Sequence, residues 1–171
     1  MKVFTQAEFD ALPVVGGYKQ CPTGDYTAIN SFGDGCRFGA GCSFGVWCSF
    51  GAGCRFGDGC SFGAGCSFGA WCRFGAWCSF GAGCSFEGGH KAKSGYPLLS
   101  IAGAGSENRT TYFFNTEDGI IVRSGCFKGT LAEFREKVRR DCPLGTEVKA
   151  VQYLGFANIV AATWSPEEIE K

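Results

Sequence analysis

A six-residue rhythm runs through the chain from Ser31 to His90. In order, the units read SFGDGC, RFGAGC, SFGVWC, SFGAGC, RFGDGC, SFGAGC, SFGAWC, RFGAWC, SFGAGC and SFEGGH. Self-similarity at a fixed short period is the signature of a solenoid, in which each unit packs only against its neighbours. The repeat therefore predicts a stack of short strands.

The chemistry of one unit predicts which side chains point inward. Cysteine and the next phenylalanine are two residues apart, as in Cys36-Arg37-Phe38, so strand alternation places both on one face and Arg37 on the other. The remaining Gly-x-Gly or Gly-x-Trp provides residues that can adopt a corner conformation. Each hexapeptide should therefore form one short strand and one corner, with Cys and Phe inside.

The outward residues bear on the number of strands in a coil. Arginines recur every eighteen residues, at Arg37, Arg55 and Arg73. Two other pairs are twenty-four residues apart: Asp34 with Asp58, and Trp47 with Trp71. Eighteen residues correspond to a triangular coil and twenty-four to a four-sided one. The arginine pattern is unbroken and favours three sides, and the four-sided alternative stays open.

The repeats resemble the hexapeptide-repeat, left-handed parallel β-helix family. That family's unit has an aliphatic residue, a small or acidic one, two free positions, a small one and a free one. Residues 38–43, FGAGCS, fit this register with Phe38 in place of the aliphatic residue. The resemblance implies a mainly β fold, a left-handed triangular solenoid of about three coils, and assembly into a homo-oligomer, either a trimer or a dimer.

The flanking segments have the composition of caps, because the open ends of a solenoid expose strand edges. Residues 1–30 form the expected N-terminal cap, with a Thr5 to Glu8 capping box opening a short helix and Tyr26 in the Phe position of a degenerate repeat. Residues 31–90 form the β-helix, and residues 91–171 form a small α+β domain. Its expected strands cover residues 98–102, 111–115 and 120–123, and its expected helices cover residues 130–140 and 147–163. This last part resembles C-terminal segments of uncharacterised proteins of phages and other mobile elements.

Most of the cysteines follow the repeat. Nine of the twelve lie at six-residue steps from Cys36 to Cys84, which is a structural period rather than a bridge pattern. Buried cysteines behave as small hydrophobes, so we expect reduced thiols. Structural zinc sites use ligands two to four residues apart, whereas this chain has one histidine and no CxxC pair. We expect no metal and no cofactor.

The charge balance limits the partners. Lys plus Arg and Asp plus Glu number 16 each, so no global field attracts duplex DNA or an anionic membrane. No apolar stretch approaches the roughly 18 residues of a membrane span, and the first residues do not form a signal peptide. We expect a protein of the bacterial cytoplasm, with no membrane partner and no duplex DNA partner.

Two outward features are candidate binding groups. The arginines Arg37, Arg55 and Arg73 would stack at strand spacing, with Asp58 in the same unit as Arg55; this row is either a solubilising face or a site for an anion. Large rings replace a corner glycine at Trp47, Trp71 and Trp77. They are either partner contacts or packing contacts with the C-terminal segment.

The family resemblance also implies an enzymatic alternative. Hexapeptide acyltransferases use a histidine base, and His90 is the one histidine of this chain. Those enzymes commonly carry a loop that leaves the coil, whereas these repeats run without insertion. We therefore favour a non-enzymatic binding protein, encoded by a phage or another mobile element, that engages a host protein or a small anionic ligand and antagonises a host defence system. An acyltransferase and a structural or virion spacer protein are the alternatives.

Overall fold

The computed structural model describes the chain except residues 94–96, 105–108, 143–146 and 170–171. It divides into two compact units, Met1–Tyr96 and Pro97–Lys171. The N-terminal segment and the repeats thus belong to one unit. In the described part of the chain, no helix has both the length and the hydropathy needed to span a bilayer.

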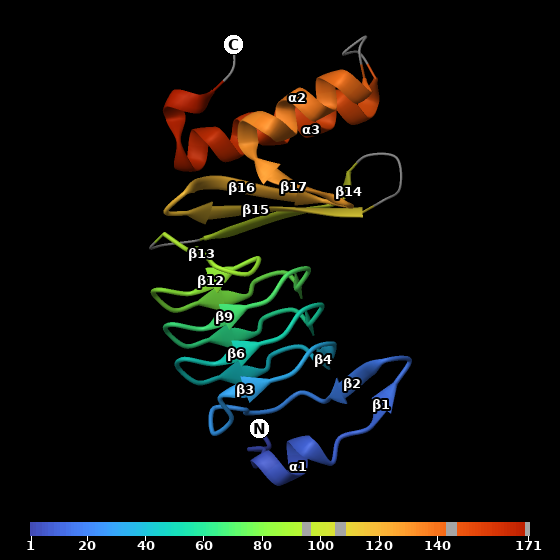
Figure 1. The fold of residues 1–171 in the computed structure, drawn as a ribbon, viewed down its shortest axis with the longest axis vertical. Helices are drawn as coiled ribbons and strands as arrows, with labels where there is room; N and C mark the ends of the chain where they lie inside the picture. The colour runs from blue at the N-terminus through green and yellow to red at the C-terminus, as the bar shows by residue number, and fades with distance from the viewer. Residues whose placement is uncertain (94–96, 105–108, 143–146, 170–171) are drawn as a thin grey trace. The chain divides into compact units, whose positions relative to one another are not determined.

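The repeats wind into a parallel β-helix with three sides (Figure 1). Residues eighteen positions apart pair in register, as Arg37 with Arg55 and Arg55 with Arg73. The first side, here called the arginine side, consists of β2 (Tyr18–Cys21), β4 (Cys36–Phe38), β7 (Arg55–Phe56) and β10 (Arg73–Phe74). The three-rung serine side consists of β5 (Ser43–Phe44), β8 (Ser61–Phe62) and β11 (Ser79–Phe80). The four-rung serine side consists of β3 (Ser31–Phe32), β6 (Ser49–Phe50), β9 (Ser67–Phe68) and β12 (Ser85–Phe86).

The observed strand pairing shows how many sides each coil has and adds to the number of coils expected. A coil contains three hexapeptides, so the four-sided alternative is wrong. On the arginine side the ladder continues below the repeats, because Gln20 of β2 pairs with Arg37 of β4. The parallel solenoid therefore has four rungs on two of its sides, slightly more than the three coils expected from the repeats alone.

Aromatic rings fill the interior, as the in-and-out pattern predicted. Along one side they stack: the centroids of Phe38 and Phe56 lie 5.2 Å apart with planes at 1°. Between sides they meet edge to face, as Phe38 does with Phe44 at 4.9 Å and 86°. Both arrangements are favourable for ring quadrupoles. Tyr26 extends one stack below Phe44 at 5.6 Å and 17°, which confirms the degenerate repeat at residues 25–30.

The cysteines form a second set of buried columns. Each thiol from the second coil onward donates to a glycine carbonyl of the coil before it; the Cys54 Sγ lies 3.4 Å from the Gly33 oxygen. No disulfide joins any of the described cysteines. The neighbouring thiol of Cys36 and burial raise the pKa of Cys54 to about 12. The columns thus pack the core and also satisfy corner carbonyls.

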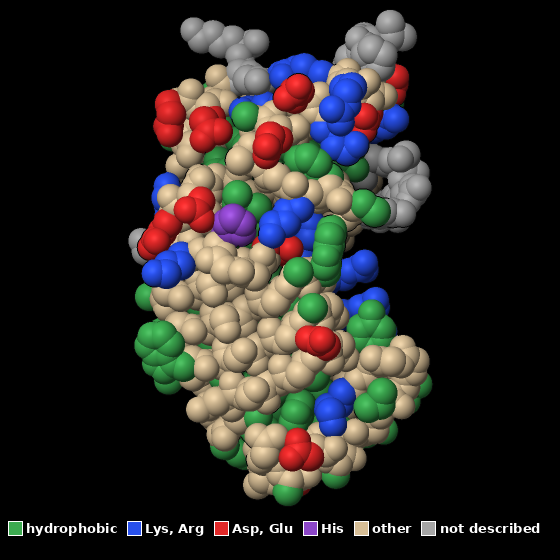
Figure 2. All heavy atoms as spheres, viewed as in Figure 1, with side chains coloured by type: hydrophobic (Ala, Val, Ile, Leu, Met, Phe, Trp, Pro, Cys, Tyr) green, Lys and Arg blue, Asp and Glu red, His purple; other side chains and the backbone are tan. Residues whose placement is uncertain are grey.

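The corners explain the invariant glycines and the unusual tryptophans. The fifth residue of each unit has a positive φ, for example +69° at Gly53 and +62° at Trp77. The third residue is glycine in the first nine units for a different reason, since a Cβ at Gly63 would lie 2.6 Å from the carbonyl of Gly45 in the coil below. Close coil stacking therefore depends on the third position. Figure 2 shows the outside of the four-rung serine side, where small side chains and backbone dominate.

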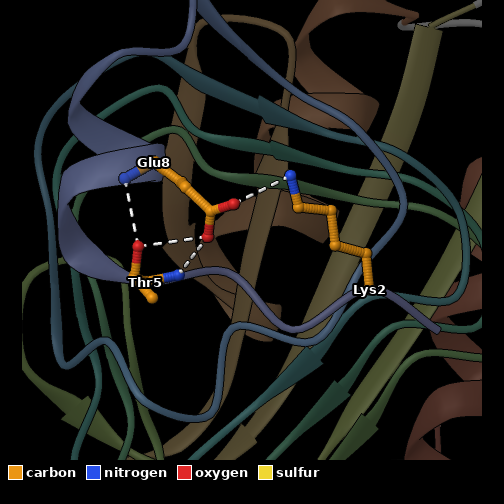
Figure 3. Close-up of polar contacts among 3 residues, drawn as sticks. All are labelled: Lys2, Thr5 and Glu8. Carbon is orange, nitrogen blue, oxygen red and sulfur yellow. Dashed lines mark hydrogen bonds and ion pairs between the residues drawn. The ribbon is translucent and has the colours of Figure 1, made fainter.

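The N-terminal cap begins with the capping box that the sequence predicted. Helix α1 (Gln6–Asp10) is capped by Thr5, whose hydroxyl accepts from the Glu8 amide while the Glu8 carboxylate accepts from the Thr5 amide at 2.9 Å (Figure 3). Lys2 lies 3.0 Å from the same carboxylate. The Thr5 amide and Lys2 lower the pKa of Glu8 to about 2. Phe9 of this helix packs edge to face on Phe32 at 5.1 Å and covers the first coil.

Two short elements at the ends of the solenoid were not predicted. Strand β1 (Val14–Val15) pairs with β2 to form an antiparallel hairpin. At the other end, β13 (His90–Lys91) turns back and pairs antiparallel with β12. Both pair with strands of the solenoid at its edges.

The C-terminal unit has the α+β architecture expected from its sequence. Its antiparallel sheet has the order β14 (Leu98–Ala104), β15 (Arg109–Thr116), β16 (Gly119–Ser124) and β17 (Phe127–Thr130). Helices α2 (Leu131–Asp141) and α3 (Val148–Trp164) pack with the sheet around Phe113, Leu131 and Val160, and a short 3₁₀ turn, η1 (Pro166–Glu168), follows. A capping box formed by Thr130 and Glu133 precedes α2. Strand β17 was not anticipated.

Candidate interaction surface on the solenoid

The predicted arginine row exists as one continuous ladder. Arg37, Arg55 and Arg73 pair in register on neighbouring strands, and all three side chains point away from the core. Arg37 and Arg73 are exposed and Arg55 is half-buried. Among the described residues, no carboxylate lies within ion-pair distance of any of the three. In the described part of the chain, the three guanidiniums therefore have no ion-pair partner.

Tyr18 explains how two of these guanidiniums are held close together. The Arg37 and Arg55 guanidinium carbons lie 4.9 and 4.4 Å from the centre of the Tyr18 ring. The Arg55 Nη2 also donates to the Tyr18 hydroxyl at 2.9 Å. A ring face attracts cations, so Tyr18 reduces the repulsion and orients both groups. Sequence reasoning missed Tyr18 because it lies outside the repeat.

Asp58 binds the backbone of the next coil. Its Oδ1 accepts a hydrogen bond from the Ala76 amide at 2.8 Å, and Asp34 binds the Ala52 amide in the same way at 2.7 Å. These carboxylates stabilise corners, and no ion pair between Asp58 and Arg55 occurs in the described structure. Asp58 nevertheless lies at the corner that follows β7, on the border of the arginine side.

The three tryptophans lie at three different corners. Trp71 precedes β10 and Trp77 follows it, so both border the arginine side at the level of Arg73. Trp47 lies at the corner between the two serine sides, away from the arginines. The exposed fractions are 74 % for Trp47, 45 % for Trp71 and 91 % for Trp77. The twenty-four-residue spacing therefore did not reflect a shared side.

Within residues 31–86, charge is confined to one part of the solenoid. Between residues 31 and 86, the charged residues are Asp34, Arg37, Arg55, Asp58 and Arg73. All of them belong to the arginine side or to one of its two corners. The serine sides and the corner between them carry none, which accords with the mostly tan surface over β6 and β9 in Figure 2.

His90 lies at the end of the solenoid. Its pairing with Phe86 places the two side chains on the same face of the sheet, and His90 is half-buried. The His90 side chain is thus directed toward the last coil, although β13 runs antiparallel to β12 and does not continue the repeat.

A separate cavity of about 570 Å³ occurs in the C-terminal unit. Its apolar wall includes Phe127 and Phe134, and Lys137, Arg140 and Lys149 contribute cations. Lys137 is paired with Asp141 at 2.7 Å. No sequence motif indicated this cavity, because its lining comes from separate elements.

One protein family matches parts of the chain. The RNA-binding, Nab2-type zinc finger matches residues 35–51, 53–69 and 71–86, which together cover less than a third of the chain. Comparisons with curated proteins and with solved structures found no match.

The zinc site implied by that similarity does not fit this structure. Each matched segment contains three cysteines six residues apart, such as Cys36, Cys42 and Cys48. These three belong to three different strand-and-corner units around one coil, and none of the matched segments contains a histidine. Structural zinc requires four ligands in a tetrahedron. Among the described residues, no group of three or more His, Cys, Asp or Glu side chains is arranged to hold a metal ion. The similarity therefore reflects cysteine spacing.

Proposed function

We propose that this chain is a non-enzymatic binding protein whose arginine side engages an anionic partner. The observation that carries the proposal is the in-register ladder of Arg37, Arg55 and Arg73, which has no carboxylate across it in the described structure. Aligned guanidiniums about 4.8 Å apart repel one another, and a bound anion relieves that repulsion.

The chemistry of the side suits phosphate or carboxylate groups. A guanidinium presents a planar fork of donors that matches either group in a bidentate way. Tyr18 holds Arg37 and Arg55 in place before binding, which reduces the entropy lost on association. The exposed rings of Trp71 and Trp77 border the same side and supply apolar contact area.

Several anionic partners are compatible with this chemistry. The matched finger family is described as RNA-binding, and bases of single-stranded RNA stack on exposed aromatic rings while phosphates contact arginine. A small anionic ligand or an acidic surface of a host protein offers the same charges. A role for a phage or mobile-element protein in antagonising host defence rests on the resemblance of residues 91–171 alone.

The proposal is tested by fluorescence anisotropy with three labelled probes: oligouridylate, polyphosphate and oligoglutamate. The variant is Arg55→Gln with Arg73→Gln, because Gln20 already occupies this outward position on the first rung. The control, Lys128→Gln with Arg139→Gln, removes two charges from the C-terminal unit. We expect at least tenfold weaker binding of one or more probes by the first variant and less than twofold change in the control. Equal losses in both variants, or no binding of any probe by the unsubstituted chain, would contradict the proposal.

The same material tests the enzymatic alternative. We expect no turnover of acetyl-CoA by the unsubstituted chain and unchanged probe binding in His90→Ala. Turnover that disappears in His90→Ala would replace the binding proposal with acyl transfer.

A further inference from the structure

The cavity of the C-terminal unit lies where a hairpin and two helices converge. Its lining comes from the turn between β16 and β17, from α2 and from the first turns of α3. Each of these three segments contributes an aromatic ring: Phe127, Phe134 and Tyr153. The ring centroid of Phe134 lies 5.6 Å from that of Phe127 and 5.5 Å from that of Tyr153. The three rings thus form one continuous apolar wall.

The cationic lining residues are more exposed than the centre of this wall. The side chains of Lys137, Lys149 and Arg140 are 37 %, 38 % and 70 % exposed, whereas Phe134 is 2 % exposed. Long cationic side chains cover apolar surface with their stems and keep their charged ends in water. The cavity therefore has an apolar interior and a positively charged opening.

The carboxylates paired with these cations do not balance all of them. Asp141 lies 2.7 Å from the Lys137 Nζ and 3.8 Å from the Arg140 Nε, so one carboxylate serves two cations. Glu147 lies 3.6 Å from the Lys149 Nζ. In this described cluster, three cations thus face two carboxylates. A ligand with a single negative charge would complete the balance.

We propose that this cavity binds a small aromatic molecule with a single negative charge, such as an aromatic carboxylate. Its ring would pack on the apolar wall, where ring edges and faces attract one another, and its anionic group would lie at the opening. The cavity volume of about 570 Å³ is within the range of small-molecule sites, which are mostly apolar with a few placed polar groups. The site belongs to the C-terminal unit, and the inference is independent of what the arginine side binds.

A matched pair of fluorescent probes tests the part played by the charge. Anilinonaphthalene sulfonate is an aromatic monoanion, and phenylnaphthylamine is the same ring system without the sulfonate. Both gain fluorescence in an apolar environment. With about 20 non-hydrogen atoms, the sulfonate should bind the full chain with a dissociation constant of roughly 10 to 100 μM.

The test variant is Arg140→Gln with Lys149→Gln, which removes two cations from the opening. We expect at least tenfold weaker binding of the sulfonate and less than twofold change for the neutral probe. The control is Lys128→Gln with Arg139→Gln, which removes the same charge from the same unit at residues that do not line the cavity. It should change neither affinity by more than twofold. Far-UV circular dichroism checks that both variants keep their fold.

Cys126 provides a readout confined to the cavity in the unsubstituted chain. It belongs to the lining, and it is the one exposed cysteine of the described chain. Its alkylation by iodoacetamide, followed by peptide mass spectrometry, should be at least fivefold slower when the sulfonate is at saturation. The arginine-side variant, Arg55→Gln with Arg73→Gln, should show the same protection.

Three results would overturn the inference. The first is no rise in fluorescence when the sulfonate is added to the unsubstituted chain. The second is an equal loss of affinity in the test variant and in its control. The third is the same rate of Cys126 alkylation with and without the sulfonate, which would show that the probe binds elsewhere on the chain. This last comparison decides the question even if the test variant does not fold.

Discussion

Trp77 provides a test of backbone strain at the corners. It is 91 % exposed and has a φ of +62°, a region in which a residue with a Cβ costs about 1 to 2 kcal/mol relative to glycine. Glycine loses more backbone entropy on folding, about 0.5 to 1 kcal/mol. We therefore predict that Trp77→Gly is more stable than Trp77→Ala by about 0.5 to 1 kcal/mol.

The comparison with the unsubstituted chain follows from burial. With 9 % of its surface covered, the Trp77 ring contributes roughly 20 Å² of burial, or about 0.5 kcal/mol. Trp77→Ala should lose about this amount, and Trp77→Gly should be nearly as stable as the unsubstituted chain or slightly more stable.

The assay is urea unfolding followed by far-UV circular dichroism, with Ala76→Gly as control. Ala76 is exposed and does not have a positive φ, so glycine there should destabilise the fold by about 0.5 to 1 kcal/mol. We expect glycine to be more stable than alanine at position 77 and less stable than alanine at position 76. If glycine is also the less stable residue at position 77, the strain assigned to these corners is absent.

Three further predictions concern coil stacking, the thiols and Tyr18. Gly63→Ala should destabilise the chain by about 2 kcal/mol or more, because the added Cβ meets the backbone of the coil below. Gly33→Ala is the control and should change stability little, since nothing lies within 4 Å of the added atom. The midpoints of urea unfolding compare the two variants. The pKa values of Cys36 and Cys54 are raised to about 12 in the fold. Their stabilising contribution is therefore complete below the unfolded-state pKa, near 8.5, and is lost as the pH rises toward 12. Unfolding midpoints that stay level between about pH 9 and 11.5 would contradict this prediction. Tyr18→Phe removes the hydrogen bond from Arg55 and keeps the ring, so thermal melting should show a loss below about 1 kcal/mol, with a larger loss in Tyr18→Ala.

The repeat was sufficient to predict the local structure of each unit. Alternation across Cys36-Arg37-Phe38 predicted a buried, exposed, buried pattern, and the structure confirms it. The glycines at corner positions indicated positive φ values, which Gly53 shows. These features depend on contacts within a unit or between identical units, so one period of sequence contains the information.

Placement around the coil was harder to predict. The side of the solenoid on which a unit lies depends on the number of units in a coil. The arginine spacing indicated three units in a coil, whereas the spacing of Trp47 and Trp71 indicated four. Once the count is three, Trp71 and Trp77 border the arginine side and Trp47 does not. Tyr18 could not be predicted from the repeat because β2, YKQC, does not share its pattern, although it provides the first rung of the arginine side.

The central claim, that the positions of the arginines matter and not only their number, is tested by a charge-conserving exchange. Arg55→Ser with Ser61→Arg moves one arginine from β7 to β8, leaving composition and net charge unchanged, and both residues already occur at this position of the repeat. Anisotropy with the probe that the unsubstituted chain binds best should show at least tenfold weaker binding, with an unchanged circular dichroism spectrum. Equal affinity in the exchanged chain would show that overall charge suffices and would contradict the account.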